Sequence, residues 1–146
     1  MNTGVMLAFL PTNTDWCKQD LPHVTLVYCG TTDQLKPSDQ NALSKDALTV
    51  AQTTDPFSTV VTGVEVFGQG TMDQPKVDVL TLYLSPKLLL ARQLVEKWNA
   101  SQYKNYEPHA TVGPEGSATG TLPTVLYFDR LLMAWGDKQL IFPLYR

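Results

Sequence analysis

The chain of 146 residues is long enough for one domain with a sizeable hydrophobic core, and we expect a single domain over residues 1–146. With 43% hydrophobic and 17% charged residues, its composition excludes disordered, fibrous and membrane-spanning proteins. The formal net charge of −3 disfavours a protein that coats duplex DNA, which needs an extended basic surface. A small phosphate-bearing ligand is compatible with this charge, because a few aimed donors suffice for one phosphodiester.

Two segments near the N-terminus predict the first strands. Residues 5–10 form an apolar run that ends at a proline and is too short to cross a membrane, so we expect a strand there. A polar loop is expected over residues 12–21. Residues 23–29 are rich in β-branched and aromatic residues and stop at Gly30, which predicts the second strand.

Apolar residues at helical spacing predict two helices. The first spans residues 37–51, where Ser38 or a neighbour can cap the start. Its apolar stripe consists of Leu43, Ala47, Val50 and Ala51. The second begins at Ser85-Pro86, which places a good N-cap before the one helical position that tolerates proline. Its expected core stripe consists of Leu88, Ala91, Leu94, Val95 and Trp98.

The remaining segments predict further strands. Residues 57–67 and 77–84 are rich in Val, Thr, Leu and Tyr, and the stretch 68–75 between them has the composition of a hairpin loop. A short strand is expected over residues 109–112, followed by strands near residues 125–135 and 139–143. The sequence therefore predicts six or seven strands and two helices, which is an α+β fold.

A short pattern occurs twice and contains both histidines of the chain. The segments are Leu21-Pro22-His23-Val24-Thr25-Leu26 and Glu107-Pro108-His109-Ala110-Thr111-Val112, and their histidines are 86 residues apart. Side chains alternate faces along a strand, so each histidine and its threonine point to one side while the apolar residues enter the core. If the two strands lie near one another, two imidazoles face each other across a groove with a hydroxyl beside each.

This arrangement suits in-line displacement at phosphorus. One neutral imidazole removes a proton from the entering oxygen, and the opposite imidazolium protonates the leaving oxygen. Histidine fits both roles because its ordinary pKa is about 6.5. His23 and His109 are therefore the candidate catalytic residues, and Thr25 and Thr111 the candidate donors to the non-bridging phosphate oxygens. The pseudo-symmetric pair does not itself assign which histidine is the base.

The two motifs resemble the hallmark of the 2H phosphoesterase superfamily, a pair of His-x-Thr/Ser-hydrophobic tetrapeptides. Here they read His23-Val24-Thr25-Leu26 and His109-Ala110-Thr111-Val112. Only the motif segments match closely, while the predicted element order is compatible with the family fold across most of the chain. The resemblance implies a bilobal α+β fold, with two antiparallel-rich sheets around a central cleft and two outer helices.

The same resemblance implies a metal-independent phosphodiesterase without a cofactor. Its substrate would be a 2′,3′-cyclic phosphate, a 2′,5′-linked RNA, a cyclic nucleotide or a cyclic oligonucleotide, so the expected partner is a small nucleotide or short RNA. The chain is shorter than typical RNA ligase-like members, which favours a compact phosphodiesterase over a ligase. A phage enzyme that degrades cyclic di- or trinucleotide signals in the host cytoplasm is one form that the resemblance allows.

Three residues near the motifs are candidate substrate contacts. Trp16 and Lys18 lie in the loop before the first motif, and Tyr106 lies just before the second. Aromatic rings can stack on a base, and a lysine can bind a phosphate. Surface loop residues without a ligand are the alternative. Cys17 and Cys29 are too few for a disulfide framework and predict reduced thiols in a cytoplasmic protein.

Other interpretations of the two histidines are open at this stage. Zinc binding is disfavoured because Cys29 is about 20 Å from His23 along an extended strand, and no Cys-x-x-Cys or His-x-x-x-His spacing occurs. The histidines could instead be structural residues at strand entrances. A module that sequesters a nucleotide or RNA end without cleaving it, and a structural virion or scaffold protein, are the alternative functions.

Overall fold

A computed structural model describes residues 2–103 and 105–145. Its seven strands are β1 (Gly4–Pro11), β2 (Val24–Thr31), β3 (Phe57–Phe67), β4 (Val77–Leu82), β5 (His109–Pro114), β6 (Val125–Trp135) and β7 (Lys138–Pro143). The helices are α1 (Pro37–Thr53) and α2 (Pro86–Val95), and a short 3-10 helix (Glu96–Trp98) follows α2. The predicted α+β class is confirmed. Strand β4 ends two residues earlier than expected, because the chain turns at Tyr83 to enter α2.

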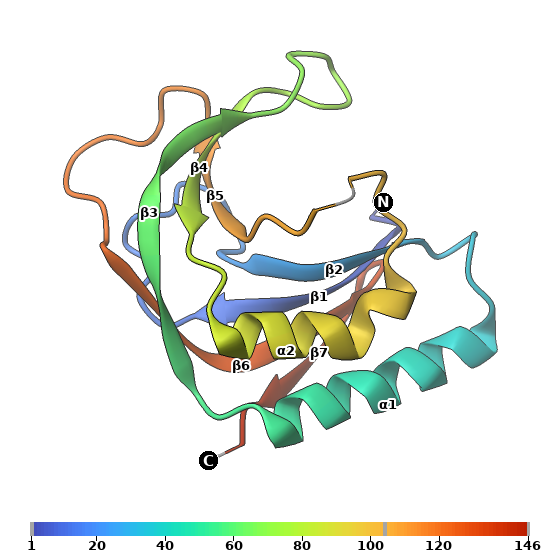
Figure 1. Cartoon of the computed structure of the whole chain (residues 1–146). Coiled ribbons are helices and arrows are strands. Elements are labelled where there is room, and N and C mark those ends of the chain that lie inside the picture. Colours follow the sequence, from blue (N-terminus) through green and yellow to red (C-terminus); the bar gives the residue numbers. More distant parts are fainter. Residues whose placement is uncertain (1, 104, 146) are drawn as a thin grey trace.

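The strands form one antiparallel sheet in the order β1-β2-β5-β4-β3-β6-β7, in which β6 also pairs with β1. The resemblance implied two sheets, whereas the structure has two groups of strands within a single hydrogen-bonded sheet. One group is β3, β4 and β5, and the other is β1, β2, β6 and β7 (Figure 1). The groups are joined by β3–β6 pairing and by one β2–β5 pair, Val24 with Ala110. The two motif strands are therefore neighbours that meet at a single point.

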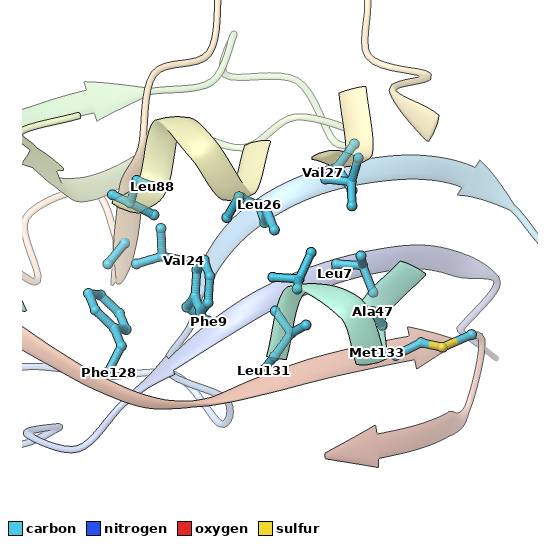
Figure 2. Close-up of a cluster of buried hydrophobic side chains, with 14 of the residues drawn as sticks. Leu7, Phe9, Val24, Leu26, Val27, Ala47, Leu88, Phe128, Leu131 and Met133 are labelled. Atoms are coloured by element: carbon cyan, nitrogen blue, oxygen red, sulfur yellow. The ribbon is translucent and has the colours of Figure 1, made fainter. Parts of the chain in front are cut away.

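Both helices lie on the same side of β1, β2 and β6 and enclose the main core (Figures 1 and 2). Alternate residues of the strands point toward the helices, as period-two alternation requires. Fully buried side chains in this layer include Leu7, Phe9, Val24, Leu26, Leu88 and Leu131. Burial of Val24 fixes the register of the first motif, because its neighbours His23 and Thr25 must then face away from the core.

The helix ends and stripes follow the sequence with one correction. The Ser85 cap is confirmed, since its hydroxyl accepts from the Leu88 backbone N–H. Of Ser38 and its neighbours, Asp39 caps the start of α1: its carboxylate accepts from the Lys36 backbone N–H at 2.8 Å. Leu94 was expected in the core stripe, but it is 48% exposed because it lies about 120° around the helix from Leu88.

Arg92 on α2 also faces inward and is 8% exposed, although the sequence periodicity did not assign its position to the core.

No helix in the described part of the chain is long and apolar enough to cross a membrane.

Candidate active site

The single β2–β5 pair places the two motifs side by side in opposite directions. Because Val24 is paired with Ala110 in antiparallel register, His23 lies across from Thr111, and Thr25 lies across from His109. Both paired residues are fully buried, so the four motif side chains share the other face, where each is partly exposed. The imidazoles occupy diagonal corners of this four-residue patch, and in a regular antiparallel pair such diagonal neighbours are about 7–8 Å apart. A separation of that size is compatible with a phosphate group bound between the two rings.

Both imidazoles are oriented by the same local hydrogen bond. The Nδ1 atom of His23 lies 2.7 Å from the Leu21 carbonyl oxygen, and that of His109 lies 2.8 Å from the Glu107 carbonyl oxygen. A carbonyl can only accept, so each Nδ1 carries the hydrogen, and each Nε2 is left to exchange a proton with a ligand. In both motifs a proline separates the histidine from the accepting residue, and its fixed φ explains why the sequence pattern includes it.

The two histidines differ in their surroundings. Burial lowers the pKa of His23 below its ordinary value of 6.5, the hydrogen bond to Leu21 partly opposes this effect, and the positive charge of His109 lowers the pKa further. The lowered pKa favours the neutral form of His23, which a general base requires.

A cleft of about 630 Å³ opens beside one half of the patch. It is bordered by Thr25 and His109, whereas His23 and Thr111 do not line it. Its walls carry aromatic side chains, including Tyr28 and Phe67, together with the amide and hydroxyl groups of Asn99, Ser101 and Asn105. The Phe67 ring lies 4.7 Å from the His109 ring, centroid to centroid. The cleft thus offers flat apolar surfaces and hydrogen-bonding groups next to one imidazole, which suits a nucleoside.

A family model described as the 2′-5′ RNA ligase superfamily matches residues 14–132, most of the chain and both motifs. The chain belongs to this superfamily, the 2H phosphoesterases. Membership indicates phosphodiesterase chemistry and confirms the resemblance that the two motifs suggested. No curated protein matches the sequence of this chain closely enough to be counted as a relative.

Solved structures share the fold of this 2H phosphoesterase at low sequence identity. Usb1 from Kluyveromyces marxianus has a TM-score of 0.65 at 13% identity, with 98% of each chain covered. TT0787 from Thermus thermophilus has a TM-score of 0.62 at 13% identity, with 97% of this chain and 98% of its own covered. LigT from E. coli, complexed with 3′-AMP, has a TM-score of 0.54 at 16% identity, with 99% of this chain and 96% of its own covered. Each of these comparisons shows a shared fold.

The three candidate substrate contacts outside the motifs have different surroundings in the structure. Trp16 is 5% exposed and packs in the core, and its indole N–H donates to the Asn13 carbonyl at 2.6 Å. The prediction that Trp16 stacks on a base is therefore wrong. Lys18 is exposed next to the second motif, because its backbone N–H donates to the Val112 carbonyl at 2.7 Å, but it does not line the cleft.

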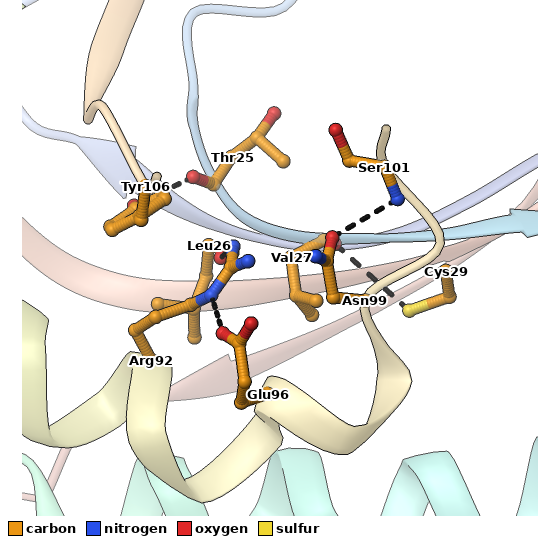
Figure 3. A network of polar contacts seen from close by, with 9 residues as sticks. All are labelled: Thr25, Leu26, Val27, Cys29, Arg92, Glu96, Asn99, Ser101 and Tyr106. Carbon is orange, nitrogen blue, oxygen red and sulfur yellow. Dashed lines mark hydrogen bonds and ion pairs between the residues drawn. The ribbon is translucent and has the colours of Figure 1, made fainter. Parts of the chain in front are cut away.

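Tyr106 does line the cleft of this 2H phosphoesterase, but its hydroxyl is already bonded within the protein. The phenol donates to the Thr25 carbonyl at 2.7 Å, and its ring faces the Arg92 guanidinium (Figure 3). Sequence reasoning did not identify Arg92, Phe67 or Tyr28 as neighbours of the site. Each belongs to an ordinary apolar or amphipathic segment, and only the tertiary fold brings these segments together.

The cysteines are not paired. Cys17 and Cys29 are free thiols, and burial raises the pKa of Cys29 to about 12, so its thiol is protonated at neutral pH. Across residues 2–103 and 105–145, no group of three His, Cys, Asp or Glu side chains is arranged to hold a metal ion.

Proposed function

We propose that this protein is a metal-independent phosphodiesterase that cleaves a small nucleotide or short RNA carrying a cyclic phosphate or a 2′,5′ linkage. The proposal depends above all on the diagonal placement of two imidazoles that share one face with two threonines, each ring oriented through Nδ1. Superfamily membership supports it. The free thiols of Cys17 and Cys29 accord with a cytoplasmic location, which is part of the proposal.

For a 2′,3′-cyclic phosphate the reaction balances with these residues alone. Neutral His23 accepts a proton from water through Nε2 as the water oxygen bonds to phosphorus. The bond from phosphorus to one ribose oxygen breaks on the opposite side, and protonated His109 gives its Nε2 proton to that oxygen. Thr25 and Thr111 donate hydrogen bonds to the non-bridging oxygens as their charge grows. The product is a nucleoside monophosphate, and solvent restores the protons of both rings.

The position of the cleft supports this assignment of roles. The leaving oxygen belongs to the nucleoside, and it must lie beside the acid. The cleft borders His109 and not His23, so a nucleoside bound there presents its ribose oxygen to His109. Its volume of about 630 Å³ is within the range of small-molecule sites. Related LigT structures contain 3′-AMP, NADP+ or ATP, which accords with a site for small nucleotides.

A substrate panel tests the proposal directly. Purified protein is incubated with 2′,3′-cyclic mononucleotides, 2′,5′-linked dinucleotides and cyclic di- and trinucleotides, with and without EDTA, and the products are separated by chromatography. We expect cleavage of at least one class, undiminished by EDTA. Binding without cleavage of any class would instead support a sequestering module, and loss of cleavage in EDTA would contradict the metal-independent mechanism. Preference for cyclic di- or trinucleotides would support a role in removing such signals.

The pH dependence tests which histidine is the base. His23 must be neutral to accept a proton, and its pKa lies below 6.5, so it stays neutral as the pH falls through that value. The acid limb of kcat/KM should therefore have its inflection below pH 6.5. The profile is measured on the best substrate of the panel in buffers of constant ionic strength. An inflection at or above 6.5 contradicts the assignment of His23 as the base.

Substitution of Phe67 tests the proposed location of the nucleoside. Stacking on an aromatic side chain is worth about 1–3 kcal/mol per base, so Phe67→Ala should raise KM by roughly 5- to 150-fold. Phe67→Tyr keeps a stacking surface and is the matched control, for which KM should change little. Equal KM values for the wild type and the alanine variant would place the base elsewhere.

A further inference from the structure

The two motif strands have little direct connection, although the proposed chemistry needs their side chains at a fixed separation. Strand β2 pairs with β5 through one residue pair, whereas β2 with β1 and β5 with β4 are paired along most of their lengths. Strands that meet at one point can pivot about it. Their other connections are the path through β1, β6, β3 and β4 and the hydrogen bond from the Lys18 backbone N–H ahead of β2 to the Val112 carbonyl of β5, so a further direct contact helps to set the distance and angle between the imidazoles of His23 and His109.

Tyr106 makes such a contact from the segment just before β5. Its hydroxyl donates to the Thr25 carbonyl at 2.7 Å, which ties the chain ahead of the second motif to the backbone of the first (Figure 3). The next residue, Glu107, supplies the carbonyl that orients the His109 ring at 2.8 Å. One hydrogen bond therefore anchors the peptide segment on which the orientation of His109 depends. Burial raises the pKa of Tyr106, so its hydroxyl remains a donor throughout the neutral range.

Arg92 supports this contact from helix α2. Its side chain is almost fully buried, its Nη1 donates to the Leu26 carbonyl at 2.7 Å, and its Cζ lies 4.6 Å from the centroid of the Tyr106 ring. Its Nε donates to Glu96 one helical turn further on, which fixes the direction of the guanidinium. Arg92 therefore contacts the first motif strand and the Tyr106 ring at once. A buried cation on an aromatic face is a stabilising contact.

We propose that Tyr106 and Arg92 form an interstrand clamp that sets the separation of the two catalytic histidines. This inference rests on the proposed function, and it makes both residues positioning residues. The clamp holds the backbone of Thr25 and Leu26 against the segment that enters β5. It acts on the geometry of the reacting groups, so its loss lowers kcat more than it raises KM.

The sharpest kinetic test removes one oxygen atom. Tyr106→Phe keeps the ring and its contact with Arg92 but loses the hydrogen bond to Thr25, and we expect kcat to fall about tenfold with less than a twofold change in KM. Tyr127→Phe is the matched control, because Tyr127 is 53% exposed on β6 outside the cleft, and it should behave as wild type. If Tyr106 served only to stack on a base, Tyr106→Phe would retain full kcat, which would overturn the clamp.

A second readout needs no substrate. The chain has two histidines, so their ring nitrogens can be titrated by NMR without ambiguity. The charge of His109 lowers the pKa of His23, and His109→Asn should therefore raise it. We expect this rise to be smaller in a Tyr106→Phe background, because the rings are then no longer held at the same separation. An equal rise in both backgrounds overturns the clamp.

The two readouts distinguish failure of the clamp from failure of the proposed function. If no substrate of the panel is cleaved but Tyr106→Phe reduces the coupling between the histidines, the clamp stands and the proposed function does not. Arg92→Lys provides an independent variant, since lysine keeps the charge but loses the planar fork that reaches Leu26 and Glu96 together. It should reduce the coupling as Tyr106→Phe does, and an unchanged coupling would remove Arg92 from the clamp.

Discussion

Replacing either His23 or His109 by asparagine should lower kcat on the best substrate by roughly 10²–10⁴-fold. Asparagine is polar and similar in size, and it can still donate to the backbone carbonyl that each ring uses, but it cannot gain or lose a proton at neutral pH. Initial rates of the purified variants measure the effect. Thermal unfolding followed by circular dichroism shows whether the fold is retained, and we expect it to be, because both rings are partly exposed.

The double variant His23→Asn/His109→Asn separates a cooperating pair from two independent contributors. Residues that act as a unit in one step are strongly non-additive, so the double variant should lose little more than the worse single variant. Full activity of the double variant would refute the proposed chemistry. Multiplicative losses would show that the two rings act in separate steps.

Removing the threonine hydroxyls should have the next largest effect. Thr25→Val and Thr111→Val keep the β-branched shape that a strand favours but remove the donor to the phosphate, and each should lower kcat by about 10²–10³-fold. Steady-state rates on the same substrate measure the loss.

Serine variants provide the control for the threonine substitutions. Thr25→Ser and Thr111→Ser keep the hydroxyl and should retain most of the activity. Thr49→Val, on the exposed outer face of α1, should be indistinguishable from wild type. Equal rates for the valine and serine variants would show that the hydroxyls do not contact the phosphate.

Local patterns predicted much of the fold and which residues lie at the centre of the candidate site. The Ser85-Pro86 start of α2 could be predicted because a cap is a property of adjacent residues. The motif histidines and threonines could be singled out because the same short pattern occurs twice. Because side chains alternate along β2 and β5, the four motif side chains could be assigned to the strand face that points away from the core, opposite to the face of Val24 and Ala110, without knowledge of the remaining fold.

What the sequence did not reveal depends on contacts between distant segments. Nothing near Phe67 indicates that the end of β3 reaches the His109 ring, because that contact follows from the pairing of β3, β4 and β5. Arg92 was not recognised because a single arginine on an amphipathic helix is usually exposed. Trp16 was misassigned to the surface because it lies in a polar loop, although its large apolar ring gains more from burial.

The matching hydrogen bonds at Nδ1 have a consequence for the direction of catalysis. In the proposed hydrolysis, His23 ends one turnover holding the proton that it took from water and His109 has given up its own, so the pair exchanges protonation states while each ring keeps its orientation. Microscopic reversibility then lets His109 accept and His23 donate as the ester bond re-forms. If a ribose hydroxyl of a second nucleotide took the place of water, it would give its proton to His23 and bond to phosphorus as His109 protonates the oxygen released from the cyclic ester, so joining would share its direction with hydrolysis, and cleavage that re-forms the cyclic ester would be its reverse.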